Sequence, residues 1–441
     1  MNRRRFLKTS AASAAMASVG SQALGQQAST APNDRITVAI AGVRGRGGGL
    51  LSTLAGLPDV DVKYVCDIDQ NARESRAAAV KQQSGKQPHA INDFRAALDD
   101  DAVDALVLGT PDHWHAIPTI MACQAGKDVY VEKPDGHNIL EGETMVAAAK
   151  KFNRVVQLGT QARSSTHIKN AIAWLASGKV GKVRFAKAWE SARQRSIGHI
   201  ADSDPPAGVD YDLWLGPAPK RPFNRRRFHG SWRWFFDYGT GDLGNDGVHR
   251  LDYARWGLAA ALAAEGKQLP DLPKAVSSHG GKQYFDDDQQ WPDNLITTFD
   301  FGDAVLTYEM RIWTPYRMLD ESEGAAILGD QGYVVIGNTR WRAFDAKGKL
   351  ISEEKGGDHS RAHAQNFIEC MRSREKPAAD LETVGHPSSM LCHLGNLAWR
   401  VGRTVKFDPQ TRNFGDDAAA NELLSRPEYR RPWTLPTIAA S

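Results

Sequence analysis

The stretch ITVAIAGVRGRGGGLLSTLAGL, residues 36–57, decides the fold. It begins as a continuous apolar run, turns at a cluster of glycines and continues with leucines at helical spacing. Glycines at such a turn let an anion approach the free N–H groups at the start of the helix. The order of strand, glycine turn and helix therefore predicts a site that holds a phosphate group.

The glycine turn departs from the pattern G-x-G-x-x-G at one position. Counted from Gly42, the second glycine is replaced by Arg44, although Gly45 and Gly47 stand close by. A second apolar run, residues 60–66, ends at Asp67, near the distance of roughly 20 residues at which an acid meets a ribose hydroxyl. An acid there also repels a 2′-phosphate, which predicts NAD in preference to NADP. The predicted cofactor contacts in this part of the chain are Gly42, Arg44, Gly45, Arg46, Gly47 and Asp67.

Strands and helices alternate through the rest of this region. The patterns predict helices over residues 71–83, 91–98 and 117–125, and strands over residues 105–109 and 128–131. Such alternation is typical of a doubly wound parallel sheet. We therefore predict a Rossmann dinucleotide-binding domain over residues 35–158. An α/β domain that binds no nucleotide is the alternative.

Two further motifs follow strands of the same predicted sheet. VEKPDGH, residues 131–137, places Lys133 directly after a strand and before a proline that favours extended geometry in the residue preceding it. TPDHWHA, residues 110–116, follows the neighbouring strand, and we interpret its histidines as pocket wall rather than as metal ligands. Carboxyl ends of parallel strands share one edge, where ligands bind. This edge adds the following predicted cofactor contacts: Thr110, Pro111, His115, Glu132 and Lys133.

The N-terminus resembles a twin-arginine export signal. Arg3 and Arg4 precede a short, alanine-rich apolar run, and small residues at 23–25 offer a cleavage site. We predict a signal peptide and linker over residues 1–34, and a mature protein that is exported folded to the periplasm or another extracytoplasmic space. A disordered basic tail is the alternative. Beyond this run, no stretch approaches the length of a membrane span.

Composition restricts the classes of partner and ligand. The chain has 441 residues, is 41% hydrophobic and carries a formal net charge of +3, without the basic, aromatic-interleaved blocks of a nucleic-acid groove. Its four cysteines lack metal-ligand spacing, so we predict no metal site. Cys370 and Cys392 are able to pair in an oxidising compartment, but buried free thiols are the preferred interpretation.

After residue 159 the pattern changes. Strand-like runs cover residues 183–190, 295–301 and 304–313, and helical patterns return at residues 363–374 and 388–401. We predict a second domain over residues 159–441, of α+β type with an open, mostly antiparallel sheet. The whole chain is then an α/β protein with two domains.

Together these motifs resemble the Gfo/Idh/MocA oxidoreductases. The resemblance rests on the glycine turn at Gly42, Asp67, TPDHWHA, VEKP and GTGDLGNDGVHRLD (residues 239–252), and it extends from residue 36 to about residue 401. It implies a nicotinamide-dependent enzyme that acts on a secondary hydroxyl of a sugar, glycoside or cyclitol. It also implies a homo-oligomer. A protein exported with such a cofactor is expected to hold it tightly.

Hydride transfer from an alcohol to NAD needs a base and a positive group at the same oxygen. The resemblance assigns these roles to His249, as base, and to Lys133, as hydrogen-bond donor. Where the family pattern D-x-G-x-H begins with aspartate, this chain has Asn245, which holds a hydroxyl but accepts no proton. We expect Asp252, one turn after His249, to orient the imidazole.

The remaining predicted substrate contacts are weaker. Gln161 and Arg163 follow a predicted strand, Trp232 offers a flat ring to a sugar face, and Asp246 and Asp252 lie beside the catalytic positions. Two other functions stay open. One is a redox-neutral, NAD-dependent glycosidase or lyase that works through a transient keto-sugar, and the other is a non-catalytic sugar-binding protein on the same fold.

Overall fold

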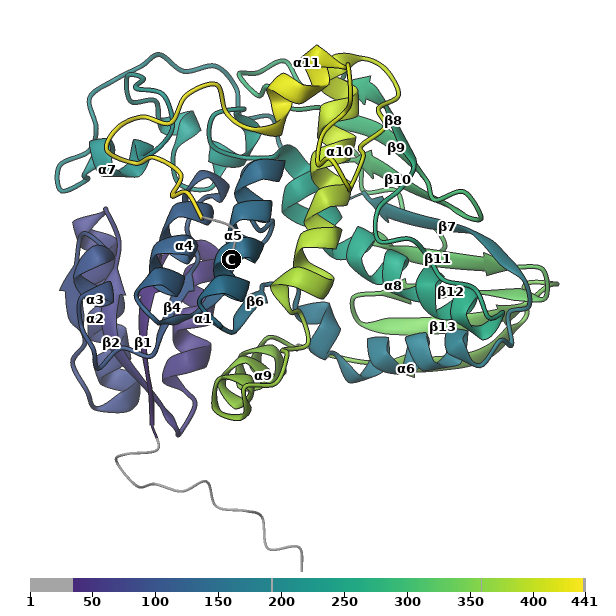
Figure 1. Cartoon of the computed structure of the whole chain (residues 1–441), viewed down its shortest axis with the longest axis horizontal. Coiled ribbons are helices and arrows are strands. Elements are labelled where there is room, and N and C mark those ends of the chain that lie inside the picture. The colour runs from purple at the N-terminus through teal and green to yellow at the C-terminus, as the bar shows by residue number, and fades with distance from the viewer. Residues whose placement is uncertain (1–34, 192, 358, 439–441) are drawn as a thin grey trace, which may run out of the picture.

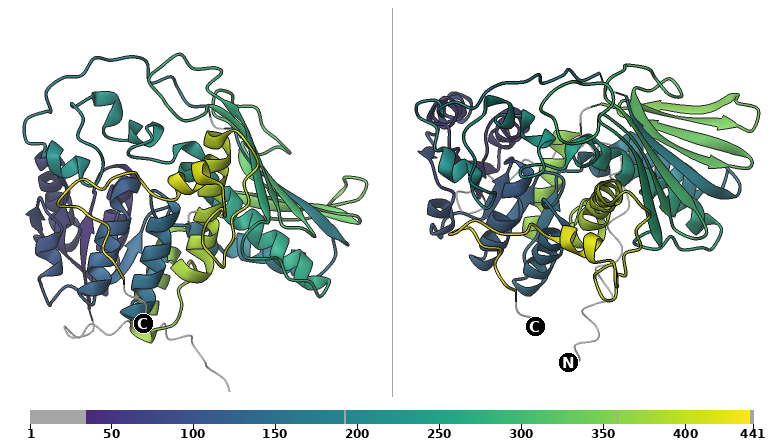
Figure 2. Two further views of the ribbon diagram at one scale, coloured as in Figure 1. Left: turned by 45° about the horizontal axis from the view of Figure 1, so that its top comes forward. Right: turned by 90° about the horizontal axis from the view of Figure 1, so that it is seen from above.

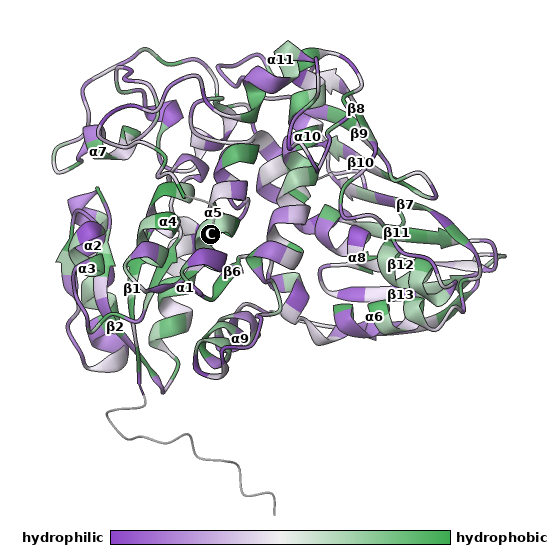
Figure 3. Ribbon diagram, in the orientation of Figure 1, coloured by the Kyte–Doolittle hydropathy of each residue, from purple (hydrophilic) through white to green (hydrophobic). Residues whose placement is uncertain are grey.

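The computed structural model describes residues 35–191, 193–357 and 359–438, so the predicted signal peptide lies outside the described residues. Two sheets stand side by side, each with its own helices (Figures 1 and 2). In Figure 3, hydrophobic residues are frequent along the strands of both sheets, where the helices cover them. The predicted fold class, a Rossmann domain beside an α+β domain, is confirmed.

The first sheet has six parallel strands in the order β3-β2-β1-β4-β5-β6. Apolar side chains bury both of its faces, as expected for a parallel sheet. From β1, the chain first adds strands on one side, β2 and β3, and then on the other side, β4 to β6. At such a switch point a crevice opens at the carboxyl ends of the two neighbouring strands, here β1 and β4. Its strands are β1 (Ile36–Ala41), β2 (Val60–Cys66), β3 (His89–Ile91), β4 (Ala105–Leu108), β5 (Asp128–Val131) and β6 (Val156–Leu158).

Helices cover both faces of the first sheet. One face packs against α1 (Gly45–Ala55), α2 (Gln70–Ser84) and α9 (Ser360–Ser373). The other face packs against α3 (Arg95–Leu98), α4 (Ala116–Gln124) and α5 (Ile139–Lys151). Helix α9 comes from far along the chain, and Figure 1 shows it below the first sheet.

The second sheet has eight strands in the order β14-β13-β12-β11-β7-β10-β9-β8, and its neighbours are antiparallel except for the pair β7 and β10. Helices α6 (Thr166–Ala176), α8 (Val248–Ala264) and α10 (His386–Val401) cover one face. The strands are β7 (Val183–Glu190), β8 (Ala275–Gly281), β9 (Asn294–Asp300), β10 (Val305–Arg311), β11 (Glu323–Gly329), β12 (Gly332–Gly337), β13 (Arg340–Asp345) and β14 (Leu350–Lys355).

A long connection from β7 to α8 carries the short helix α7 (Tyr211–Leu215) back over the first domain (Figure 1). Near the C-terminus, α11 (Ala418–Asn421) and the segment after it return to the same domain, where Trp433 joins the core. No helix in the described part of the chain is long and apolar enough to cross a bilayer.

Two sequence predictions of the fold are corrected. The helix predicted over residues 91–98 is a strand end followed by a single helical turn, because Asp93 accepts the Arg95 N–H and delays the helix. The domain division predicted at 158 assigns α9 to the second domain, whereas Phe367 and Ile368 of α9 pack in the core beside the first sheet. Cys370 lies in that core and Cys392 in the other, and both are buried free thiols as preferred.

Gly47 lies where helix α1 packs most closely against the backbone of the first βα unit. A Cβ added to Gly47 would lie 1.8 Å from the Gly42 carbonyl oxygen, so α1 approaches β1 and β4 only because the side chain is missing. We expect Gly47→Ala to destabilise the fold by at least about 3 kcal/mol, because backbone rather than a flexible side chain must move. Denaturant unfolding would measure this.

Gly49→Ala is the matched control, since Gly49 is exposed on the same helix and a Cβ there meets nothing within 4 Å. It is expected to be neutral or to stabilise by up to about 1 kcal/mol through helix propensity. Equal loss in both variants would show that close packing at Gly47 is unimportant.

Candidate cofactor and catalytic site

A cavity of about 420 Å³ lies at the carboxyl edge of the first sheet. The ends of β1, β2, β4 and β5 and the glycine turn form its floor. Its far end reaches Asn245, in the turn that precedes α8. Most of the predicted cofactor contacts line it, namely Gly42, Arg44, Gly45, Arg46, Asp67, Thr110, Pro111, Glu132 and Lys133. The predicted edge of the sheet is therefore a concave site.

The glycine turn has the features of a phosphate cradle. Helix α1 begins at Gly45 with no side chain capping its first N–H groups, so these donors face the cavity. Gly42 adopts a φ of +75°, and a Cβ there would lie 2.7 Å from the Thr110 nitrogen. These observations fit a dinucleotide, whose pyrophosphate needs free donors and a close backbone approach.

Asp67 presents a fixed carboxylate at the end of β2. Its Oδ2 accepts the Val43 N–H at 2.9 Å and its Oδ1 accepts the Asp69 N–H at 3.0 Å. Burial raises the pKa of Asp67, against the opposing effect of these two hydrogen bonds. The orientation suits an acceptor for ribose hydroxyls.

The two arginines of the glycine turn are already paired with carboxylates. Arg44 lies 3.0 Å from Asp69, and the Arg46 Nε lies 2.9 Å from Glu132. The pKa of Arg46 is raised by Glu132 although burial opposes this. Each guanidinium of the glycine turn therefore already has a carboxylate partner.

The connection between β7 and α8 forms a roof over the cavity. His229, Gly230, Trp232 and Arg233 line it from above, opposite the ends of β1 and β2. His229 Nε2 lies 3.1 Å from Asp69, where burial lowers the pKa of the imidazole to about 4. The roof is thus tied to the first domain.

Backbone contacts fasten the same roof further along. The Gln70 N–H donates to the Gly208 carbonyl at 2.9 Å, and the Asp210 N–H donates to the Ile68 carbonyl at 3.0 Å. Both contacts join the start of α2 to the segment before α7. A ligand in the cavity is therefore enclosed by two chain segments from different domains.

The segment TPDHWHA serves the domain junction. His113 Nε2 and Trp114 Nε1 both lie 2.9 Å from the Trp214 carbonyl. His115 is buried and does not line the cavity: its Nδ1 lies 2.6 Å from the Pro134 carbonyl and its Nε2 lies 2.9 Å from the Thr110 carbonyl. The prediction of a cofactor contact is therefore wrong for His115, which instead ties the lysine loop to β4.

Lys133 reaches the second domain. Its Nζ donates to Asn245 Oδ1 at 3.1 Å, and Asn245 Nδ2 donates to Asp246 Oδ2 at 3.0 Å. Lys133 and Asn245 both line the end of the cavity. The asparagine thus takes the place of a carboxylate as the partner of the lysine, and it leaves the lysine charge uncompensated at this contact.

The chain before α8 is not a regular α-helix. Residues Leu243–Gly247 form a π-turn, a single turn of π-helix, and α8 follows from Val248. Such turns cost stability and are frequent at functional sites. The wider turn directs Asp246 toward Asp242 and Glu190.

His249 is buried next to Lys133. Its exposed fraction is 9%, and its imidazole forms no hydrogen bond with any residue that the structure describes. Burial lowers the pKa of His249 well below its ordinary value, and the charges of Lys133 and Arg250 lower it further. The imidazole is consequently neutral near pH 7 and has a nitrogen available for a proton.

Three predicted substrate residues are placed elsewhere. Arg163 forms a two-pronged ion pair with Asp252, whose carboxylate also accepts the Ser388 hydroxyl at 2.7 Å. This ion pair is buried, so Arg163 and Asp252 hold α8 to its neighbours instead of contacting a substrate or orienting His249. Asp246 likewise does not line the cavity.

Trp232 does line the cavity, whereas Gln161 lies outside it. Gln161 begins a 3-10 turn after β6, and its Oε1 is buried without a hydrogen-bond partner in the described residues. Its predicted contact with a substrate remains a prediction.

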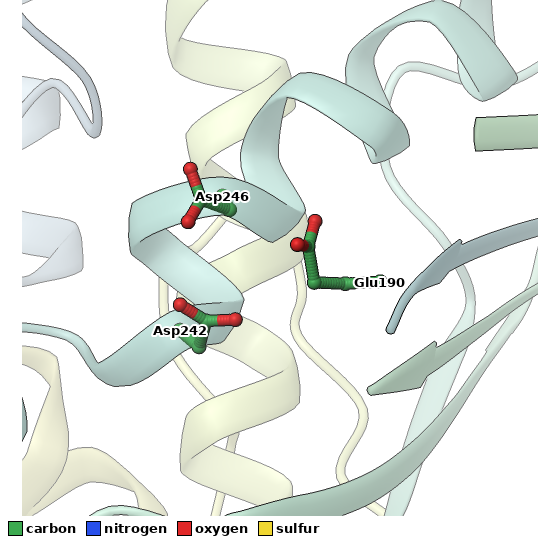
Figure 4. Close-up of side chains that lie close together, drawn as sticks. All are labelled: Glu190, Asp242 and Asp246. Carbon is green, nitrogen blue, oxygen red and sulfur yellow. The ribbon is translucent and has the colours of Figure 1, made fainter. Parts of the chain in front are cut away.

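The sequence analysis missed a carboxylate cluster beside the catalytic positions. Glu190, Asp242 and Asp246 each place one oxygen within 4.8 Å of the others (Figure 4). Burial and the neighbouring Asp246 raise the pKa of Asp242 to about 7. Asp242 belongs to the quoted GTGDLGND motif, but no spacing in the sequence connects it to Glu190 at the end of β7.

The fold and the cavity define a two-domain dinucleotide-binding protein. Residues 36–160 match the model of the oxidoreductase family, NAD-binding Rossmann fold, and residues 180–311 and 320–435 match that of the oxidoreductase family, C-terminal alpha/beta domain. These matches cover most of the chain, which therefore belongs to the Gfo/Idh/MocA oxidoreductase family. They confirm the resemblance that the sequence motifs indicated. Residues 1–20 match the twin-arginine translocation signal.

Known relatives differ in how much of the chain they share. An NAD⁺-dependent scyllo-inositol 2-dehydrogenase of Bacillus subtilis is 24% identical over 330 residues, 71% of this chain and 80% of that protein. A glycosyl hydrolase family 109 protein of Saccharopolyspora erythraea is 29% identical over 158 residues, 35% of this chain and only 34% of its own length. The structure of WlbA dehydrogenase from Bordetella pertussis with NADH and UDP-GlcNAcA has a TM-score of 0.62 at 17% identity, over 85% of this chain and 99% of that one.

Proposed function

We propose that the protein is an NAD(H)-dependent oxidoreductase that oxidises a secondary hydroxyl of a sugar, glycoside or cyclitol. The observation that carries the proposal is that Lys133, which lines the end of the cavity, lies close enough to the buried His249 for its charge to act on the imidazole. A relative with dehydrogenase activity toward scyllo-inositol, similar over most of both chains, supports this substrate class.

The bound nicotinamide would supply the hydride acceptor. Lys133, held by Asn245, donates a hydrogen bond to the reacting hydroxyl and stabilises its developing negative charge. His249, neutral at pH 7, takes the hydroxyl proton on a ring nitrogen that has no partner in the described residues. Non-catalytic sugar binding would need neither the buried neutral base nor the positive donor.

We further propose export to the periplasm or another extracytoplasmic space with the cofactor in place. The match to a twin-arginine signal supports export of a folded protein. The roof over the cavity, fastened through His229 and Gly208, supports slow release of a bound dinucleotide. We also propose a homo-oligomer formed through the open face of the second sheet, where Ile296 is 52% exposed.

The protein is expected to purify with close to one NAD(H) per chain. Asp67 faces the ribose position and the two arginines of the glycine turn are paired, so the released nucleotide should be NAD(H) and not NADP(H). Acid extraction followed by chromatography measures both its amount and its identity.

His229→Ala tests the roof, because it removes the contact with Asp69 without touching the glycine turn. The variant should retain less nucleotide after extended dialysis than the unaltered protein. His199→Ala, on an exposed loop, is the matched control. An empty protein that turns over only with added NAD would contradict retention.

A redox-neutral glycosidase or lyase is the second candidate function. The glycosyl hydrolase family 109 relatives favour it, although the matches span about a third of their length, 34% and 38%. Such an enzyme oxidises a ring carbon, eliminates and reduces again, so the nicotinamide absorbance shows no net change. Release of a glycoside's leaving group without accumulated NADH would distinguish it from a dehydrogenase.

A further inference from the structure

The carboxylate cluster of Glu190, Asp242 and Asp246 is assigned no role by the hydride chemistry. Glu190 ends β7, and the two aspartates belong to the π-turn region before α8. Figure 4 shows the three side chains converging from these two elements. The exposed fractions of Glu190 and Asp242 are each 1%, so the cluster lies under the surface.

Several oxygens of the cluster lack hydrogen-bond donors. Both carboxylate oxygens of Asp242 and the Oε2 of Glu190 are buried without a hydrogen-bond partner in the described residues, although the longer Arg250 ion pair reaches Glu190 Oε2. A buried carboxylate without a partner costs several kcal/mol, so such groups are normally protonated or bound to a cation. Asp246 receives a side-chain donor, from Asn245 Nδ2 at 3.0 Å.

Tyr308 gives an independent indication of a missing ligand. It lies on β10, fully buried with an exposed fraction of 0%, and its hydroxyl has no partner in the described residues. The hydroxyl is aimed at the π-turn, since a Cβ added to Gly247 would lie 2.8 Å from it. A fourth oxygen therefore faces the same space as the carboxylates.

Protein cations compensate the cluster only in part. The Arg250 Nε lies 3.6 Å from Glu190, but Arg250 also pairs with Glu323. Lys133 and Arg233 act on Asp242 through their charges but form no ion pair with it. Arg250 thus contacts Glu190 and Glu323 directly, and neither Asp242 nor Asp246 forms an ion pair with the residues that the structure describes.

We propose that Glu190, Asp242 and Asp246 bind a divalent cation, with the Tyr308 hydroxyl facing its coordination shell. An all-oxygen donor set selects a hard cation over zinc or copper. Calcium accepts six to eight oxygen ligands in a flexible geometry and binds carboxylates directly, whereas magnesium demands near-ideal octahedral geometry and keeps several of its waters. Calcium is therefore the expected occupant, and manganese the next best fit.

The cation would act as a positioning element. Asp246 lies between the cluster and Asn245, which contacts Lys133. Fixing Asp246 would hold the π-turn and keep the lysine's partner in place. The cation itself lies behind the hydroxyl-binding groups and takes no part in the hydride step.

The experiment titrates calcium, manganese and magnesium chlorides into the chelator-treated full chain by calorimetry. Terbium luminescence, excited through nearby phenol and indole rings, gives a second readout that does not depend on activity. We expect one calcium per chain and a rise of the thermal midpoint with calcium. Asp242→Asn and Glu190→Gln, which keep the side-chain shapes, should weaken binding by more than about a hundredfold.

Tyr308→Phe keeps the ring and removes only the hydroxyl, so it should weaken binding to a smaller extent. Asp286→Asn is the matched control, because Asp286 belongs to an exposed acidic pair beside His199. It should bind calcium as the unaltered protein does. Absence of calcium heat and terbium emission in the unaltered protein, or unchanged binding in Asp242→Asn and Glu190→Gln, would overturn the proposal.

Discussion

Replacement of Lys133 by methionine is expected to slow hydride transfer by about 10²- to 10³-fold, which is the cost of removing one donor from a developing oxyanion. Methionine keeps the length and apolar volume of the side chain and removes its charge. Nucleotide content should stay near that of the unaltered protein, since the glycine turn and Asp67 are untouched.

Single-turnover absorbance of the nicotinamide, with a sugar or cyclitol selected from a panel, measures this rate. Lys347→Met, on the exposed turn between β13 and β14, removes the same charge far from the cavity and should not change it. If Lys133→Met keeps most of the rate, the ammonium group does not stabilise the reacting oxygen.

Replacement of His249 by alanine is expected to reduce the same single-turnover rate by at least about a hundredfold, the usual contribution of a general base. Burial and the charges of Lys133 and Arg250 favour the neutral imidazole. A base with a lowered pKa keeps its activity as the pH falls through 6.5. The rate should therefore decline only at more acidic pH.

The pH dependence of single-turnover hydride transfer tests whether the pKa of His249 is lowered. An acidic limb centred above pH 6.5 would contradict the lowered pKa, and a fast His249→Ala variant would place the base elsewhere. Asn245→Asp is the control within the site. It adds a carboxylate at the Lys133 contact but leaves the base in place, so its effect should be far milder.

The sequence alone determined the part of this protein that depends on local order. Gly42, Gly47 and Asp67 predict a βαβ unit with a dinucleotide site because their roles are set by backbone conformation and by short separations along the chain. Lys133 was placed at the same edge because parallel strands end together. Strands β7, β9 and β10 of the second sheet were predicted in the same way, since alternation of buried and exposed residues in a strand such as β10 is a local pattern, whereas β8 and β11 to β14 were not predicted.

Tertiary structure decided everything that joins distant segments. Arg163 looked like a substrate contact until Asp252, which is far away in sequence, was found to neutralise it. Helix α9 resembles any amphipathic helix, and nothing local shows that its apolar face covers the first sheet.

The π-turn belongs to this second group. Its extra residue in the turn leaves no mark in composition, yet it turns Asp246 toward Asp242 and brings both aspartates to Glu190. Residue type and spacing show which chemical groups a chain carries and how the side chains of residues near one another in sequence are oriented. The charge that surrounds each group depends on which remote strand or helix packs against it, and only the folded chain sets that.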